Sequence, residues 1–204
     1  MRTLDPDVIA AYQAGRIVKR NLLWITGRDR DTGDLHSIGF WDEVEAATIT
    51  VNDGFGAGAV SRAFNAAGGL ISVGNVPLTS DLSIRNVDVA ISPLNADADQ
   101  YLRGYDLKMQ PVQIWRPLFD PDTWEIVANP EPRFVGFVDK APVITPAEGG
   151  QATATLSCVS HTVELTRFNP DVRSDESQKL RGGDRQYQYT GVMGTRKIYW
   201  GANP

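Results

Sequence analysis

The sequence predicts a mainly β protein: an antiparallel β-barrel or sandwich with two short helices and an extended C-terminal arm. The prediction rests on three extended segments at residues 111–119, 133–144 and 151–165, which are rich in β-branched and aromatic residues. Turns that contain Pro, Gly and Asp separate these segments. Short strands joined by such turns are typical of an antiparallel meander.

The third segment shows the two-residue alternation of a strand with one covered face. One face carries Ala152, Ala154, Leu156 and Cys158, and the other carries Thr153, Thr155, Ser157 and His161. The predicted core of the meander contains Leu156, Cys158, Ile114, Val135 and Phe137. In the second segment, Phe134 and Val138 alternate with the last two of these residues, so the register of that strand stays open.

The first 41 residues predict a helix followed by a hairpin. The D-P-D sequence at residues 5–7 supplies a cap and a proline for the first turn, and Gly15 suits the helix end. Three apolar residues at helical spacing would dock this helix on the sheet: Val8, Ile9 and Tyr12. Strands at residues 17–26 and 35–41 would follow as a hairpin with a polar tip.

A strand at residues 45–51 leads into a glycine-rich stretch, N-D-G-F-G-A-G-A-V, at residues 52–60. A phosphate-binding loop needs such glycines between a strand and a helix, with a Lys or an acidic partner at fixed spacing. Neither condition is met here. The composition favours a flexible loop, or one that a neighbouring chain orders.

Two further strands are predicted at residues 70–76 and 79–92. In the second, the apolar phase changes partway, and a bulge near Arg85 would restore it. A second short helix at residues 93–104 is marked by Ser92-Pro93 and by a terminal Gly.

The chain changes character after Leu165. Residues 166–185 carry charges of mixed sign and few apolar side chains, so they cannot build a core of their own. An aromatic ending follows at residues 186–201. Two interpretations stay open: an arm that reaches over another subunit, or a surface loop with a final strand packed on its own domain.

Composition excludes several functions. A formal net charge of −5, with Arg and Lys spread along the chain, argues against nucleic-acid binding as the main task. Cys158 is the single cysteine and reads as a core residue, and His36 and His161 lack partners at ligand or catalytic spacing. We therefore expect no enzyme, no cofactor and no metal site.

Two further expectations concern location. The beginning of the sequence has no signal-peptide hydrophobic region, and no run of about 18 apolar residues occurs. These features predict synthesis in the cytoplasm without secretion by the usual route and without membrane insertion.

A carbohydrate-binding β-sandwich module is the alternative from another functional class. Its stacking platforms would be exposed aromatic residues among Trp41, Trp115, Trp124 and Trp200. Trp124, in the polar turn D-P-D-T-W-E, suits that role best; the competing interpretation folds its ring back on the sheet.

An ordered set of short motifs resembles a known family. The motifs are T-S-D-L-S-I-R-N-V-D-V-A-I-S (79–92), D-L-K-M-Q-P-V-Q-I-W (106–115), F-V-G-F-V-D (134–139), A-T-A-T-L-S-C-V-S (152–160), R-S-D-E-S-Q-K-L-R-G-G-D (173–184) and K-I-Y-W-G (197–201). In this order they resemble small tail-tip proteins of phages with long, non-contractile tails and of related gene-transfer particles. No single motif is specific; the order is.

The resemblance implies a tail-tube-like β-barrel or sandwich that forms a hub-type ring in the baseplate at the tail tip of the virion. It implies a link between the tail tube or distal tail ring and the central hub and fibre, with three-fold symmetry preferred to six-fold. A distal tail ring is the alternative. The implied partners are further copies of the chain, the distal tail or tube protein, the tape measure, the hub or peptidase and the central fibre. The iron–sulfur part of some relatives is not implied, because Cys158 stands alone.

The predicted domains are residues 1–165, a barrel with an N-terminal helix and inserted loops, and residues 166–204, an arm that contacts neighbouring subunits. The predicted inter-subunit contacts are Arg167, Arg173, Ser177, Gln178, Arg181, Gly183, Asp184, Tyr187, Tyr189, Tyr199 and Trp200. Arginines suit bidentate pairing with carboxylates, and aromatic residues dominate interface energetics.

Overall fold

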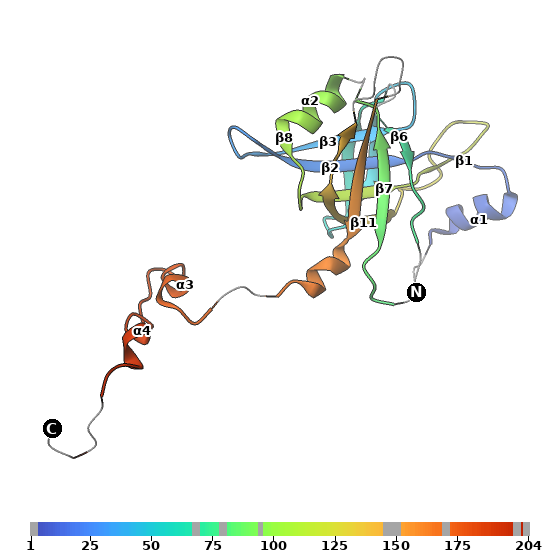
Figure 1. Ribbon diagram of the computed structural model, residues 1–204. Helices are drawn as coiled ribbons and strands as arrows, with labels where there is room; N and C mark the ends of the chain where they lie inside the picture. The colour runs from blue at the N-terminus through green and yellow to red at the C-terminus, as the bar shows by residue number, and fades with distance from the viewer. Residues whose placement is uncertain are drawn as a thin grey trace. The chain divides into compact units, whose positions relative to one another are not determined.

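The computed structural model describes residues 4–66, 70–77, 81–93, 96–144, 152–168, 172–197 and 201. Its helices are α1 (Pro6–Ala14), α2 (Ala96–Gly104), α3 (Asp175–Lys179), α4 (Thr190–Met193) and the 3-10 helix η1 (His161–Thr166). Its strands are β1 (Val18–Lys19), β2 (Leu22–Asp29), β3 (Leu35–Trp41), β4 (Ala47–Asn52), β5 (Ala59–Phe64), β6 (Leu70–Val73), β7 (Asn86–Ile91), β8 (Tyr105–Asp106), β9 (Pro111–Trp115), β10 (Leu118–Phe119), β11 (Pro132–Lys140), β12 (Val143–Ile144) and β13 (Thr153–Ser160). The chain divides into two compact units, Met1–Glu164 and Leu165–Pro204 (Figure 1).

The first unit is built on one large antiparallel sheet. Within the described residues this sheet has nine strands in the order β3-β2-β9-β11-β13-β7-β6, with β12 on β13 and β8 on β2. The order β9-β11-β13 is the predicted meander. Figure 1 shows β2 and β3 running nearly crosswise to β7, so the sheet curls strongly between its two edges. The predicted mainly β, antiparallel barrel or sandwich is confirmed.

The sheet is covered on both faces near β2 and β9. The concave face holds the larger core, to which β2 contributes Leu23 and Ile25. The opposite face holds a second core, to which the same strand contributes Leu22 and the neighbouring strand Trp115. Leu22 and Leu23 are adjacent and both fully buried, as expected for a strand with a core on each side.

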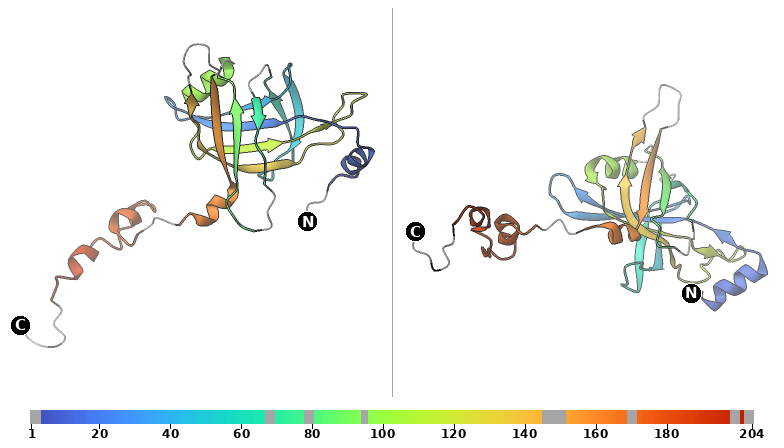
Figure 2. Two further views of the ribbon diagram at one scale, coloured as in Figure 1. Left: turned by 45° about the vertical axis from the view of Figure 1, so that its right-hand side comes forward. Right: turned by 60° about the horizontal axis from the view of Figure 1, so that its bottom comes forward.

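A separate hairpin closes the second core. Among the described residues, strands β4 and β5 form a two-stranded sheet with each other, and β5 lies against β3 and β2 (Figure 2). Ile49, Val51 and Phe64 are buried between this hairpin and the main sheet. The second core thus gives the protein a local sandwich that the meander alone does not have.

In β11 the predicted core residues Val135 and Phe137 are wrong, and the alternative register is the one observed. Phe134 and Val138 are buried, whereas Val135 and Phe137 are only partly covered. The reason is the pairing: Phe134 is opposite Ile114, and Val138 is opposite Cys158. Directly opposed residues share a face, so the two confirmed core residues Ile114 and Cys158 draw Phe134 and Val138 inward.

The N-terminal helix has the predicted ends but not the predicted packing. The Asp7 amide donates to Asp5 Oδ1 at 2.9 Å, and Gly15 ends α1 at φ 72°. The docking expectation is wrong, because α1 has no buried residue and Ile9 and Tyr12 are 43% and 42% exposed. The helix leads into β1, which pairs only with the short strand β10, so the chain enters the fold beside the main sheet rather than over it.

Several strands are shorter than predicted, among them β7 and β13. No bulge forms near Arg85, because β7 begins only at Asn86 and the residues before it, such as Leu82, are exposed. Strand β13 ends at Ser160, whose hydroxyl accepts from the Arg85 amide at 3.1 Å. His161 therefore starts η1 and does not continue the strand.

Cys158 offers a simple test of this core. Its side chain is fully buried in β13, and burial raises the pKa of the thiol to about 12. Because the thiolate is the reacting form, we expect no reaction with 5,5′-dithiobis(2-nitrobenzoate) near neutral pH until denaturant unfolds the chain. Rapid reaction of the native protein would show that Cys158 lies on the exposed face of β13.

Candidate functional site

The second unit, expected as a C-terminal arm, contains two short helices, α3 and α4. Ser174 caps α3, accepting from the Ser177 amide at 3.2 Å, and the first turn carries acidic residues. Helix α4 lies within the aromatic ending, where one interpretation placed a final strand. No strand occurs among the described residues of this unit, so that interpretation is wrong for residues 186–197.

Ion pairs hold the turns of this unit together. Asp175 receives Arg185 Nη2 at 2.9 Å and Lys179 Nζ at 3.2 Å. The hydrogen bond from Arg185 and the contact with Lys179 hold the pKa of Asp175 below its ordinary value. Asp184 accepts from Gln178 Nε2 at 2.7 Å. Part of the polar surface of the unit is thus satisfied locally, and exposed pairs of this kind add little stability.

Five of the predicted contact residues surround one hollow of about 410 Å³ on this unit: Arg173, Ser177, Gln178, Arg181 and Tyr187. The Oε1 atom of Gln178 is buried and has no hydrogen-bond partner among the described residues. Arg173 and Arg181 also line the hollow, and their guanidinium groups suit a carboxylate.

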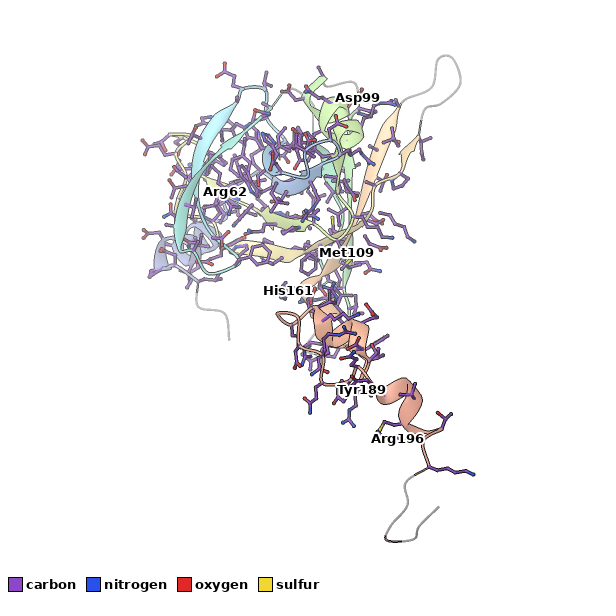
Figure 3. The ribbon with its side chains drawn as sticks, turned by 90° about the vertical axis from the view of Figure 1, so that its left-hand side faces the viewer. Arg62, Asp99, Met109, His161, Tyr189 and Arg196 are labelled. Atoms are coloured by element: carbon purple, nitrogen blue, oxygen red, sulfur yellow. The ribbon has the colours of Figure 1, made fainter. Side chains whose placement is uncertain are left out.

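The apolar side chains of the second unit face outward. None of its described residues is buried. Large apolar residues are exposed along it: Leu165, Phe168, Val172, Leu180, Tyr189, Val192 and Met193. Tyr189, labelled in Figure 3, is 65% exposed. Leu180 is 85% exposed, so these side chains are available for contact with another chain.

The remaining predicted contacts are distributed as follows. Gly183 and Asp184 lie in the turn after α3, with Gly183 at φ 82°. Arg167 lies just after η1 and is exposed. Tyr199 and Trp200 lie outside the described residues.

The two units differ in charge. Residues 165–204 carry seven Lys and Arg against four Asp and Glu, a net charge of +3. Residues 1–164 carry thirteen against twenty-one, a net charge of −8. The two units are therefore opposite in net charge.

The glycine-rich stretch is ordered by its own chain, contrary to expectation. Asp53 Oδ2 accepts from the Phe55 amide at 3.0 Å and the Ala57 amide at 3.3 Å. Its Oδ1 pairs with Arg62 and accepts from Gln113 Nε2 at 2.8 Å. The short acidic residue shapes the turn between β4 and β5, as Asp does in many tight turns.

This network also fixes the hairpin to the main sheet. The guanidinium of Arg62 lies 4.8 Å from the Trp24 ring centre and 5.0 Å from that of Trp115. Figure 3 shows Arg62 among the side chains packed inside the first unit. The side chains of Arg62 and Asp53 are 11% and 6% exposed. The sequence analysis missed this network, although an Asp in the turn and an Arg on the returning strand are visible signals.

The tryptophans proposed as stacking platforms for a carbohydrate differ in their exposure. Trp115 is fully buried and is not a platform, and Trp200 lies outside the described residues. Trp41, Phe119 and Trp124 come together around a pocket of about 370 Å³, with Arg20 and Glu43 on its wall. Trp124 is 56% exposed.

Within the part of the chain that the structure describes, no group of three or more His, Cys, Asp or Glu residues could hold a metal ion. His161 contacts the ring of Phe137, with centres 5.2 Å apart, and His36 lies beside Tyr105. No helix in the described ranges has the length and apolar character needed to cross a membrane.

The comparisons with known proteins are sparse. No protein-family model matches the chain, and no curated protein matches it. A solved chain from a structure described as "Virion of native gene transfer agent (GTA) particle" is similar to it, with 15% sequence identity and a TM-score of 0.49. The match covers 84% of this chain and 50% of that chain, so this chain spans half the length of the virion chain. At these values no functional argument rests on the likeness.

Proposed function

We propose that this chain is a structural subunit of a phage-type particle, a hub-type ring protein of the tail tip that performs no enzymatic step. The observation that carries the proposal is the second unit, which buries none of its described residues and exposes its large apolar side chains. The ordered motifs that resemble tail-tip proteins supply the place in the particle. The likeness to the virion chain is compatible with the proposal and does not carry it.

Energetics favour an arm that binds a neighbour. Ordering a residue costs roughly 1–2 kcal/mol of backbone entropy, and exposed ion pairs recover little of that cost. Burying Leu180, Val192 and Met193 against another chain would offset it, at about 25 cal/mol per Å² of apolar surface. Arg173 and Arg181 at the hollow would donate to a carboxylate from the acidic first unit of the neighbouring copy.

Leu180→Ser tests this role, because Leu180 is 85% exposed and its loss should not unfold the chain. Burial of a leucine side chain is worth about 1.5–3 kcal/mol, so we expect self-association to weaken by at least about tenfold. Sedimentation velocity over a range of concentrations measures this change.

Leu82→Ser is the matched control, since Leu82 is 81% exposed on the first unit. It should leave association unchanged. Added salt should weaken association of the parent chain, because complementary charges draw the two units together. Equal association of the Leu180→Ser chain and the parent chain would contradict the role of the arm.

The place in the particle has its own test. A small tag on the exposed loop that contains Leu82, imaged with labelled antibody on purified particles, should mark the tail tip. Label on the capsid or along the tube would contradict the hub assignment.

A further inference from the structure

A second feature of the first unit points to a ligand, and it does not rest on the proposed function. The pocket of about 370 Å³ has three aromatic lining residues, Trp41, Phe119 and Trp124, and its charged lining residues are Arg20, Glu43 and Glu45. The ring centres of Trp41 and Phe119 are 6.5 Å apart, and so are those of Phe119 and Trp124. Aromatic walls with a few convergent polar groups are the usual make-up of a small-molecule site.

Trp124 is held in a conformation that a bulky residue rarely adopts. Its φ is 59°, in the left-handed region. Asp120 imposes this turn: its Oδ1 accepts from the Asp122 amide at 2.8 Å, and its carbonyl accepts from the Trp124 amide at 2.9 Å. Strained residues that the surrounding structure fixes in this way cluster at binding sites.

The fixed turn leaves the indole half in solvent. With 56% of Trp124 exposed, the ring is not folded back into the core. It contacts Phe119 and still presents apolar surface at the pocket mouth. The turn therefore places an aromatic platform before any ligand arrives.

The pocket already contains its own cation. The Arg20 guanidinium lies 5.6 Å from the Trp124 ring centre, and Arg20 Nε donates to Glu43 Oε1 at 2.5 Å. An incoming Lys or Arg side chain would meet this guanidinium, and Glu43, one of the two acidic residues on the lining, is already paired.

The same pair suits a ligand with hydroxyl groups. The side chains of Arg20 and Glu43 are 25% and 26% exposed, so both can reach a ligand in the pocket. Guanidinium N–H groups donate and carboxylate oxygens accept, which matches hydroxyls in either role. The net charge of −8 on residues 1–164 disfavours anionic sugars.

We infer that this pocket is a carbohydrate subsite, which takes one neutral pyranose ring with its C–H face on Trp124 and its hydroxyls on Arg20 and Glu43. The binding is reversible and involves no covalent step. Such a subsite would give the protein a saccharide-recognition function in addition to assembly.

Saturation-transfer difference NMR on the full chain tests the subsite. The probes are methyl β-D-glucopyranoside, methyl β-D-galactopyranoside and N-acetyl-D-glucosamine. We expect saturation of the ring protons of at least one probe. Trp124→Gly should weaken that binding by at least about tenfold. Glycine adopts positive φ without strain, so this variant keeps the turn and should retain the melting temperature of the parent chain.

Phe55→Ala is the control, because Phe55 is 48% exposed and lies outside the pocket. It should bind the same probe as the parent chain does. Three results would overturn the inference: no transfer to any of the three sugars at concentrations of tens of millimolar, equal binding by the folded Trp124→Gly chain, or binding of N-acetyl-arginine amide that Trp124→Gly removes. The last result would mark a peptide site instead.

Discussion

Asp53→Ala should be among the most destabilising single substitutions in the first unit. The substitution leaves the Arg62 guanidinium without its carboxylate at a site where the Arg62 side chain is 11% exposed. It also removes the acceptor for the Phe55 and Ala57 amides and for Gln113. Breaking one partner of a buried pair costs about 3–5 kcal/mol, so we expect Tm to fall by about 10 °C for a chain of this size.

The same pair predicts a dependence on acid. Burial alone would raise the pKa of Asp53, but the hydrogen bond from Gln113, the amides of Ala57 and Phe55 and the Arg62 charge outweigh it, so the pKa lies below 3.8. The folded state therefore binds this proton less readily than the unfolded state. Its stability contribution is present above the unfolded pKa and is lost as pH falls through the folded one.

Thermal unfolding by circular dichroism at neutral and acid pH measures both effects. The Tm of the parent chain should fall in acid partly because Asp53 becomes protonated. Asp53→Ala lacks this carboxylate, so its Tm should fall less between neutral and acid pH. Asp34→Ala is the control, since Asp34 is an exposed carboxylate in another hairpin turn. A loss below about 1 kcal/mol in Asp53→Ala would show that other groups compensate the Arg62 charge.

Gly136→Ala should be comparably severe. A methyl group at this position in β11 would lie 2.0 Å from the carbonyl oxygen of Val159 and 2.9 Å from its carbon. That carbonyl belongs to β13, so relief requires the two central strands to separate. Overpacking of a core usually costs about 1–3 kcal/mol of stability. The Val159 carbonyl is part of the backbone and cannot rotate away as a side chain could, so we expect a loss of at least about 3 kcal/mol for Gly136→Ala.

Gly104→Ala is the matched control. No atom within 4 Å would contact its added methyl group, and it ends α2. Its urea midpoint should stay the same or rise slightly, because alanine restricts the unfolded chain. If Gly136→Ala lies within about 0.5 kcal/mol of the parent chain, β11 and β13 are not as close as the structure places them.

Local patterns predicted much of the fold. A cap, a proline and a glycine located α1, and Gly104 located the end of α2, which begins at Ala96 and not at residue 93. The alternation in residues 152–158 located the buried face of β13. These features act within a few residues of the chain, so a single sequence contains them.

Features that depend on pairing between distant segments were not predictable in the same way. In β11 both faces are apolar, so only the partners Ile114 and Cys158 decide that Phe134 is buried. Likewise, Trp41 and Trp124 share a pocket because β10 carries the chain back beside β1. Helix α1 precedes β1 and is exposed because the pair of strands β1 and β10 lies beside the main sheet.

In the second unit, too, local features were predictable from the sequence and features that depend on folding were not. Its charge and its lack of apolar core residues were visible in the sequence, and the helical turn at α3 could have been found from Ser174, which caps it, and Lys179 in its last turn. The hollow around Gln178 depends on a turn at Gly182 and Gly183, both at positive φ, that brings Tyr187 back toward α3. No local sequence pattern identifies a binding partner for this unit.

We propose that the arm of one copy, residues 165–204, binds the acidic first unit of another. Chains labelled with ¹⁵N and unlabelled chains, mixed when dilute and then concentrated, can be joined by a carbodiimide that links lysines to carboxylates. Crosslinks within α3, where Lys179 Nζ lies 3.2 Å from Asp175, must stay within one isotope and serve as the control. We predict that crosslinks from Lys179 and Lys197 to carboxylates of residues 1–164 combine both isotopes. If all such crosslinks stay within one isotope, the arm binds its own chain and the account is wrong.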